Sequence, residues 1–253
     1  MKLGLISDIH SNREALDAVL EHLGRQGVER TFCLGDVIGY GPDPEYCVDR
    51  VRAVCEVTLM GNHDEGLFHG AEGFNPHARG ALDFTRRRMR PRWWRGGAVK
   101  SRWEWLRGLP LRYEEPGHLW VHGSPRDPVR EYVLSTDGFL NPSKLAAIFA
   151  AFDGLAFAGH THHPGAIDEN FKFFGLEGRE QFRLELETGR KYFLNAGSVG
   201  QPRDGDSRAC YAVLEPGAIT WYRVPYDIPT TQRKIRQHPE LNEVLASRLA
   251  MGR

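Results

Sequence analysis

The chain has 253 residues, 41% of them hydrophobic, and 33 Lys and Arg residues balance 33 Asp and Glu residues, so its formal net charge is zero. This length and hydrophobic content indicate a folded globular protein with a sizeable core. The balanced charge argues against a protein whose main role is to coat nucleic acid, although a local basic patch is still compatible with it.

The cysteines and the N-terminus indicate a cytoplasmic protein. Cys33, Cys47, Cys55 and Cys210 form no C-x-x-C pair, which favours reduced and mostly buried thiols. The first eight residues hold one lysine and a short apolar run, which is too short for a signal peptide. Since no apolar run approaches the ~20 residues that cross a bilayer, we expect no membrane partner.

Strands and helices alternate in the first sixty residues. The apolar patterns predict a strand at 2–7, a helix at 12–23, a strand at 30–35, a helix at 44–55 and a strand at 56–60. Alternation at these intervals is typical of βαβ units, which form a parallel sheet. Residues 66–115 differ, because they are rich in Arg, Gly and Trp and show no strand pattern. We interpret them as two or three helical pieces that form an inserted cap.

The α/β pattern resumes after this insertion. We predict a strand at 118–121, a helix at 142–152 with Asn141 as its N-cap and Pro142 at its first position, and a strand at 154–158. Further strands are predicted at 171–176, 182–187, 191–195, 209–215 and 218–224, the last two as a hairpin. A polar helical tail follows at 228–253. We expect one domain over residues 1–253, with the cap and the tail included.

Side chains that can bind metals follow the central strands. They are Asp8, His10, Asp36, Asn62, His122, His160 and His162. Ligands bind at the carboxyl edge of a parallel sheet, so these distant residues are expected to meet there. The spacing of Asp8 from His10, and of His160 from His162, predicts that each pair points the same way from extended chain.

Seven such side chains exceed the needs of one metal ion and suit two ions about 3.5–4 Å apart that share a carboxylate. Asp36 is the expected bridge, because it follows a sharp turn at Gly35 near the middle of the edge. Imidazole, carboxylate and amide together favour Mn, Fe, Co, Ni or Zn over Ca or Mg. Manganese is our first expectation.

A pair of such ions favours phosphate-ester chemistry. Two divalent cations, two carboxylates and a bridging hydroxide leave a formal charge of +1, which attracts an anionic ester. Water bound to such a metal loses its proton near neutral pH and can attack phosphorus in line. His63 has no place among the ligands, so we predict that it protonates the leaving oxygen as general acid and that Asp64 fixes its tautomer.

These residues carry a family resemblance. The segments D-I-H (8–10), G-D-V-I-G (35–39), G-N-H-D (61–64), H-G (122–123) and G-H-T-H (159–162) resemble the calcineurin-like metallophosphoesterase signature in order and spacing. The segments S-D-I-H-S-N and N-A-G-S-V-G-Q-P-R-D-G-D resemble its small bacterial phosphodiesterase-like branch, with Ala196 where proline is usual. The resemblance covers about residues 2–224.

The resemblance implies an α/β fold, a four-layer αββα sandwich of two mixed β-sheets flanked by helices. It also implies how the ligands divide between two ions: Asp8, His10, Asp36 and His162 for one, and Asp36, Asn62, His122 and His160 for the other. His63 is implied as the catalytic histidine.

Four further residues are candidates for substrate binding. Asn12 either reaches a substrate phosphate or caps the first helix, and the cap is the favoured interpretation. The Gly-rich segment at 197–206, which begins beside Asn195 and holds Ser198 and Arg203, either cradles a phosphate or is a plain surface loop.

The segment T-R-R-R-M-R-P-R-W-W-R (85–95) is the most basic part of the chain. With Trp93, Trp94, Trp103 and Trp105 it either grips a polyanion or anchors the insertion to the core, and anchoring is favoured. Nucleic acid is therefore a possible partner that the sequence does not favour, and the expected partner is a small phosphate ester.

Three functions remain in competition. The leading hypothesis is an enzyme that hydrolyses a phosphodiester or phosphomonoester with two metal ions. A nuclease or a nucleotide or dinucleoside polyphosphate hydrolase is the second, and a non-catalytic scaffold with the same fold is the third. The sequence does not indicate the natural substrate or the oligomeric state.

Overall fold

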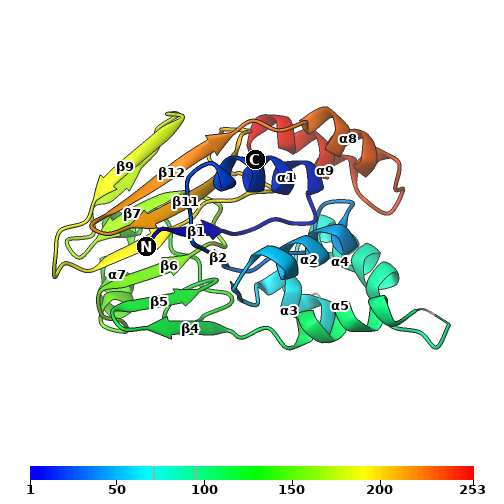
Figure 1. Cartoon of the computed structure of the whole chain (residues 1–253), viewed down its shortest axis with the longest axis horizontal. Coiled ribbons are helices and arrows are strands. Elements are labelled where there is room, and N and C mark those ends of the chain that lie inside the picture. Colours follow the sequence, from blue (N-terminus) through cyan, green and yellow to red (C-terminus); the bar gives the residue numbers. More distant parts are fainter. Residues whose placement is uncertain (71, 95) are drawn as a thin grey trace.

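Two mixed β-sheets form the centre of the molecule in the computed structural model, which describes residues 1–70, 72–94 and 96–253 (Figure 1). In the described residues each sheet has six strands. The first sheet contains, in spatial order, β3 (Val57–Thr58), β2 (Arg30–Cys33), β1 (Leu3–Ile6), β11 (Ala209–Glu215), β12 (Ala218–Val224) and β9 (Gln181–Glu185). The second contains β4 (Arg112–Glu115), β5 (His118–Val121), β6 (Leu155–Ala158), β10 (Tyr192–Asn195), β7 (Gly165–Asp168) and β8 (Phe173–Gly175).

Within the described chain, each sheet contains three adjacent parallel strands. In the first sheet β1, β2 and β3 run parallel, with Leu5 beside Phe32 and Cys33 beside Thr58. In the second sheet β5, β6 and β10 run parallel, and their neighbours β4 and β7 are antiparallel to them. The carboxyl ends of two parallel groups are therefore available to build one site.

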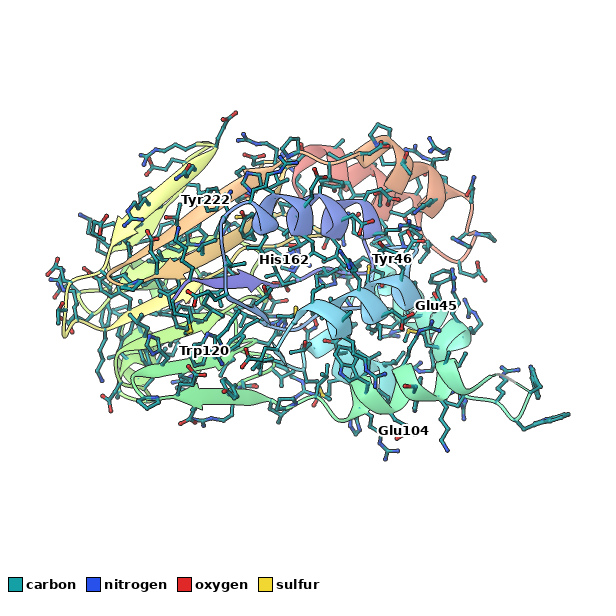
Figure 2. The ribbon with its side chains drawn as sticks, viewed as in Figure 1. Glu45, Tyr46, Glu104, Trp120, His162 and Tyr222 are labelled. Carbon is teal, nitrogen blue, oxygen red and sulfur yellow. The ribbon has the colours of Figure 1, made fainter. Side chains whose placement is uncertain are left out.

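Both faces of the second sheet are buried, and successive side chains of its strands point alternately into two cores. Trp120 in β5 and Phe157 in β6 point into the core between the two sheets, where Figure 2 shows Trp120. Their neighbours Val121 and Ala158 point to the other face, into a separate core beneath α7. Because both faces are covered, these strands consist of nearly continuous apolar residues, as the sequence suggests.

Helices cover the outer faces of the sheets. The helices of the described chain are α1 (Arg13–Gly24), α2 (Pro44–Val54), α3 (Asn62–His69), α4 (Pro76–Met89), α5 (Gly97–Arg107), α6 (Asp137–Leu140), α7 (Pro142–Phe149), α8 (Ile228–Arg236), α9 (Glu243–Ser247) and the 3₁₀ helix η1 (Arg248–Met251). Leu16 and Val19 of α1 pack on the first sheet, and Leu145 and Ile148 of α7 pack on the second. The predicted four-layer αββα sandwich is confirmed.

The predicted helical insertion corresponds to α3, α4 and α5, which group together beside α2 in Figure 1. It begins earlier than the sequence suggests, because α3 already starts at Asn62. The prediction that 66–115 lacks strands is wrong at its end, where β4 pairs with β5. The extent of the domain, 1–253, stays a prediction.

Two local predictions also need correction. β7 (Gly165–Asp168) was missed, because it follows a proline and has only two apolar side chains between a glycine and an aspartate. Asn141 precedes α7 as expected and Pro142 opens the helix, but the side chain of Asn141 makes no capping hydrogen bond within the described residues. It donates instead to Oδ1 of Asp137 at 2.8 Å.

The carboxylate of Asp137 is the centre of a buried polar cluster. We expect Asp137→Asn to destabilise the protein by about 1–3 kcal/mol at neutral pH, because the cluster loses a charged hydrogen-bond acceptor. Lys144 Nζ lies 2.6 Å from its Oδ2, and the backbone N–H of Leu134 donates to the same oxygen at 2.8 Å. Burial alone raises the pKa of Asp137, but these donors outweigh it and lower the pKa below its usual value. Urea unfolding of both proteins measures the difference.

The sign of the pH dependence follows from this lowered pKa. The stability that Asp137 contributes is present above the pKa of an unfolded Asp, about 4, and is lost as the pH falls through the lower folded pKa. The gap between wild type and Asp137→Asn should therefore shrink in acid. Asp153→Asn, at a side chain that is 96% exposed, is the control and should change stability by less than about 0.5 kcal/mol. A gap that is independent of pH would contradict this account.

Candidate metal centre and substrate cavity

The candidate site lies where the carboxyl ends of the two groups of parallel strands meet. His162 sits near the middle of the molecule, between the sheets and the helical insertion (Figure 2). Side chains that follow five different strands are brought together there: Asp8, His10, Asp36, Asn62, His63, His122, His160 and His162. All are buried except Asn62, which is half-buried.

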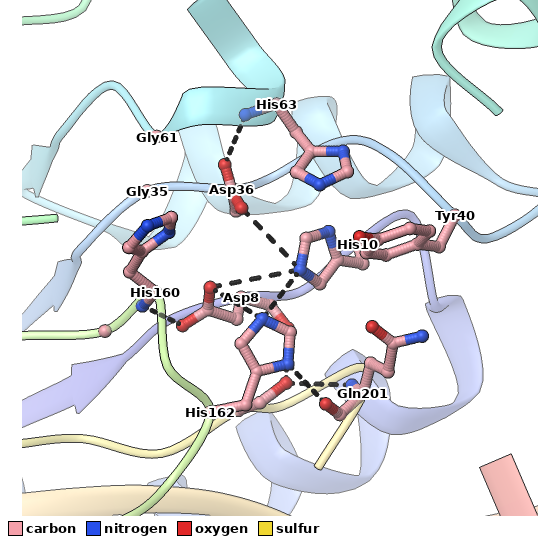
Figure 3. Close-up of polar contacts among 12 residues, drawn as sticks. Asp8, His10, Gly35, Asp36, Tyr40, Gly61, His63, His160, His162 and Gln201 are labelled. Atoms are coloured by element: carbon pink, nitrogen blue, oxygen red, sulfur yellow. Dashed lines mark hydrogen bonds and ion pairs between the residues drawn. The ribbon is translucent and has the colours of Figure 1, made fainter. Parts of the chain in front are cut away.

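Among the described residues, three groups of side chains have the geometry to hold a cation. They are Asp8–His10–His162, Asp36–His122–His160 and His10–Asp36–His63, and in each the candidate ligand atoms lie within 4.8 Å of one another. Asp36 belongs to two of the groups. Its Oδ2 lies 3.7 Å from His10 Nε2 (Figure 3). The same oxygen lies 3.5 Å from His122 Nε2. That Asp36 bridges two ions stays a prediction.

The backbone at these residues is left-handed rather than extended. Asp8 and His10 have φ of 52° and 49°, and His160 and His162 have φ of 64° and 62°. The prediction that each pair points one way from extended chain is therefore wrong, because β1 already ends at Ile6 and β6 at Ala158. The side chains converge because the chain coils after each strand. Such backbone costs about 1–3 kcal/mol per residue and is held here by surrounding hydrogen bonds.

Backbone carbonyls orient four of the histidines. One ring nitrogen of each contacts a carbonyl oxygen: His10 Nδ1 and Ile38 at 3.3 Å, His122 Nδ1 and Leu34 at 2.8 Å, His160 Nε2 and Arg130 at 3.0 Å, and His162 Nδ1 and Gln201. A nitrogen that donates to a carbonyl carries the ring proton, so the opposite nitrogen presents a lone pair. This arrangement is typical of metal-binding histidines.

The charges of the site also favour a cation. Burial opposes ionisation of Asp36, but His122 and the other nearby histidines outweigh it and hold its pKa well below the usual range. Burial likewise disfavours charge on His122, yet Asp36 raises the pKa of His122 to about 9. Burial and, to a smaller extent, the nearby charge of His122 lower the pKa of His160 to about 3. Asp36 is thus ionised and His160 neutral, whereas His122 is protonated without a metal and would release that proton to a bound cation.

Atoms that lack partners fit a bound metal. Oδ1 of Asp8 is buried without a hydrogen-bond partner in the part of the chain that the structure describes. It lies 3.2 Å from His162 Nε2, which is itself 3.1 Å from His10 Nε2 (Figure 3). Two imidazole lone pairs and a carboxylate oxygen that face one another are satisfied by a cation. The donor set of imidazole, carboxylate and amide suits a transition metal.

Gly61-Asn62-His63-Asp64 forms the start of α3, with Gly61 as its N-cap. A side chain at Gly61 would collide with the carboxylate of Asp36, so glycine permits this close approach. Oδ1 of Asn62 lies 3.1 Å from His122 Nε2, which places the amide beside the second ligand group. The backbone N–H of His63 donates to Asp36 Oδ1 at 2.8 Å.

The expected role of Asp64 needs correction. Its carboxylate accepts from the backbone N–H groups of Val37, Ile38 and Gly61 at 3.1–3.3 Å, and no hydrogen bond joins it to His63 among the described residues. Burial raises the pKa of Asp64 to about 7. Asp64 therefore fixes the loop that carries Asp36, because α3 turns its side chain toward that backbone and away from the imidazole of His63.

The imidazole of His63 lies between the ligands and aromatic side chains. Its ring centroid is 4.7 Å from that of His10, 4.5 Å from Tyr40 and 4.9 Å from Phe74. Nδ1 of His63 is buried without a hydrogen-bond partner in the described chain. Burial lowers the pKa of His63 to about 4, so the free protein holds a neutral imidazole with an uncommitted nitrogen.

A cavity of about 220 Å³ opens above the site. Its lining residues are Asp36, Tyr40, Asn62, His63, Glu72, Gly73, Phe74, Asn75, Ala78, Arg130, Tyr132, His160, His162 and Arg203. Tyr132 stacks on His160 with ring centroids 4.0 Å apart. Sequence reasoning missed the aromatic wall of Tyr40, Phe74 and Tyr132. The only hint was that Tyr40 follows the G-D-V-I-G segment.

Arginines flank Tyr40. Arg203 Nη2 donates to the Tyr40 hydroxyl at 3.3 Å and to Gln201 Oε1 at 3.1 Å, which holds the guanidinium at the cavity. The guanidinium carbon of Arg248, from η1, lies 4.3 Å from the centroid of the Tyr40 ring. Burial lowers the pKa of Arg248 to about 10. The tail thus supports the wall of the cavity, a role that its polar sequence did not indicate.

The other predicted substrate-binding residues use their polar atoms inside the protein. Asn12 caps α1 by accepting from the N–H of Ala15 at 3.2 Å, as the favoured interpretation had it. Asn195 donates to the carbonyl of Gly159 and Ser198 donates to that of Asp8, so both position the ligand loops. Of the four, only Arg203 lines the cavity.

Comparison with known proteins agrees with this fold. Residues 1–218 match the calcineurin-like phosphoesterase superfamily domain, and the chain belongs to that family. It is 38% identical to a metallophosphoesterase from Sphaerobacter thermophilus, whose crystal structure superposes with a TM-score of 0.84 over 100% of this chain and 99% of that one.

Two archaeal proteins are also similar. An uncharacterized protein of Methanocaldococcus jannaschii is 34% identical over 260 residues, which cover 99% of this chain and 98% of that protein. A hypothetical protein from Pyrococcus horikoshii, 18% identical, shares the fold with a TM-score of 0.71 over 100% of this chain and 98% of its own. In the described residues we find no helix both long and apolar enough to cross a membrane.

Proposed function

We propose that this protein hydrolyses a small phosphate ester with the help of two divalent transition-metal ions. The observation that supports this most strongly is the position of Asp36 at the base of a cavity, between His10 of the Asp8–His10–His162 group and His122 of the Asp36–His122–His160 group. Arg203 lies on the wall of the same cavity. Shared carboxylates are typical of two-metal hydrolytic sites. Membership of a phosphoesterase family adds independent support.

Asp8, His10, Asp36 and His162 would hold one ion, and Asp36, Asn62, His122 and His160 the other. When bound, the ions would supply positive charge that attracts the phosphate and lowers the pKa of water. The chain supplies the remaining parts. Backbone carbonyls keep the histidine rings in place, Arg203 pairs with a phosphate oxygen, and Tyr132 forms part of the wall beside the leaving group.

His63 is proposed to deliver the proton that the leaving oxygen needs. Its free nitrogen and its place on the cavity wall support this role. The imidazole must be charged to act as an acid, although burial lowers the pKa of His63 to about 4 in the free protein. A negatively charged ester beside the ring favours the charged form, so the proton would arrive with the substrate.

The experiment that tests the function uses metal-depleted protein. It is reloaded separately with Mn²⁺, Zn²⁺, Co²⁺ or Ni²⁺ and assayed on p-nitrophenyl phosphate and bis-p-nitrophenyl phosphate. We expect turnover that returns with metal, with manganese as first choice, and a metal content near two per chain. Bound metal without turnover on either ester, or on a wider panel of phosphate esters, would favour the non-catalytic scaffold instead.

Arg203→Gln should raise KM for these esters by at least about tenfold, because a charged hydrogen bond to phosphate is lost. We expect kcat to change less and the metal content to stay constant, since Arg203 is not a ligand candidate. Arg179→Gln is the matched control, because Arg179 is an exposed arginine outside the cavity. An unchanged KM in Arg203→Gln would remove this residue from the substrate site.

A further inference from the structure

A strongly basic segment spans the end of α4, its connection to α5 and the beginning of α5. Residues 86–102 contain seven arginines and one lysine, but no aspartate or glutamate. The whole chain has no net charge, so this is a local concentration of positive charge. The connection projects from the body of the molecule at the right-hand edge of Figure 1.

The structure divides the tryptophans of the insertion into two kinds. Trp103 and Trp105 are partly buried and pack against the core, with Trp103 edge-on to Phe68 at 4.8 Å. They anchor the insertion, as the sequence interpretation favoured. Trp93 and Trp94 are 92% and 59% exposed, and anchoring does not explain them. Their rings meet edge to face at 5.4 Å, which leaves broad ring faces open to solvent.

One arginine contacts these exposed rings, and it also lines a hollow with other arginines. Arg92 lies over the Trp94 ring with its guanidinium carbon 5.3 Å from the ring centroid. The same Arg92 lines a hollow of about 130 Å³ together with Asp83, Arg86, Arg87 and Arg90. Asp83 and Arg86 are three residues apart on one face of α4 and form an ion pair at 2.8 Å, and Arg90 is the C-cap of this helix. The carbonyls of Gly66 and Leu67 also accept from Arg86, which fixes the position of its guanidinium.

We propose that Trp93, Trp94 and the arginines of this hollow form a binding surface for single-stranded nucleic acid. Exposed aromatic rings are platforms on which unpaired bases stack, and a basic groove follows the phosphate backbone. Arginine outnumbers lysine here, and its planar guanidinium both pairs with phosphate and stacks on rings. Charge complementarity with a polyanion and open stacking faces occur together in the same few residues.

A membrane surface fits these residues less well. Interfacial segments combine basic residues with an apolar face of Trp, Phe and Leu. Residues 86–102 contain no Leu, Ile or Phe, Met89 is buried, and the tryptophans are followed by Gly96 and Gly97. Two isolated tryptophans among arginines therefore suit stacking better than insertion into lipid.

This surface is separate from the cavity. Asn75 and Ala78, at the beginning of α4, line the cavity, while the exposed tryptophans follow its end. A helix of 14 residues is about 20 Å long. Variants of the surface should therefore bind nucleic acid poorly and still hydrolyse a small ester, so failure of this proposal and failure of the proposed function can be told apart.

The test measures the fluorescence anisotropy of a fluorescein-labelled oligothymidylate titrated with the full chain in EDTA, which prevents metal-dependent cleavage. We expect binding that weakens steeply with salt. The double variant Trp93→Ala/Trp94→Ala should bind at least tenfold more weakly. Arg92→Gln should reduce the slope of log K against log salt by roughly 0.7, the value for one phosphate contact on a single strand.

The chain offers a matched control for each variant. Phe139→Ala removes an aromatic side chain that is 90% exposed elsewhere, and Arg179→Gln removes an arginine that lies over Phe182 at 5.4 Å. Neither should change binding. Absence of binding at low salt, or equal losses in the controls, would overturn the proposal. Binding to phosphatidylserine vesicles without binding to the oligonucleotide would overturn it in favour of a membrane surface.

Discussion

Asp36→Asn is expected to have the largest effect of any single substitution in this protein. Asp36 belongs to two of the ligand groups, and its Oδ2 is 3.5 Å from His122 Nε2 and 3.7 Å from His10 Nε2. An amide of the same shape keeps the hydrogen bond from the His63 N–H but loses the negative charge. Both proposed ions depend on that charge, so we expect the metal content to fall from about two per chain to one or none.

The loss of turnover should be at least about a hundredfold, because substitution of residues that only support metal ligands already costs about 10–100-fold. Elemental analysis and assays on bis-p-nitrophenyl phosphate measure the two effects in one preparation. Asp49→Asn is the control, since Asp49 is exposed and pairs with Arg102 far from any ligand group. If Asp36→Asn keeps both ions and full activity, the shared-carboxylate centre is wrong.

His63→Ala is expected to keep its metal and lose about 10²–10⁴-fold in kcat, the usual contribution of a general acid. The rate loss should grow with the basicity of the leaving group, because a poor leaving group depends more on its proton. Phenyl phosphate should therefore suffer more than p-nitrophenyl phosphate. His69→Ala, at an exposed position on the same helix, should leave both rates unchanged.

The same variant decides between two roles that the geometry allows for His63. The ligand atoms of His63, His10 and Asp36 lie within 4.8 Å of one another. His63 is therefore placed either to bind a metal ion or to act as an acid. If His63→Ala loses an ion, the residue is a ligand. If the metal content is intact and both esters slow equally, His63 positions the substrate without transferring a proton.

Much of the sandwich follows from local patterns in the sequence. Apolar runs of four to six residues predicted β1, β2, β5, β6 and β10, and polar residues directly after most of these strands predicted the edge that binds ligands. The hydrophobic period and the residues that end a strand are properties of neighbouring positions, so they can be read without knowing the fold. β7 escaped because its sequence, G-A-I-D, has only two apolar side chains between a glycine and an aspartate.

The residue types that follow the strands are visible in the sequence alone, and they predict a cluster of imidazole and carboxylate groups. How each group is used depends on the three-dimensional arrangement of the chain. Asp64 bonds to backbone 26 and 27 residues away, and Arg248 reaches Tyr40 from the far end of the chain. Trp93 and Trp103 are alike in sequence, yet one is exposed and the other packed. The physical reason is that burial, partner choice and left-handed backbone depend on contacts between distant segments, which short-range patterns do not encode.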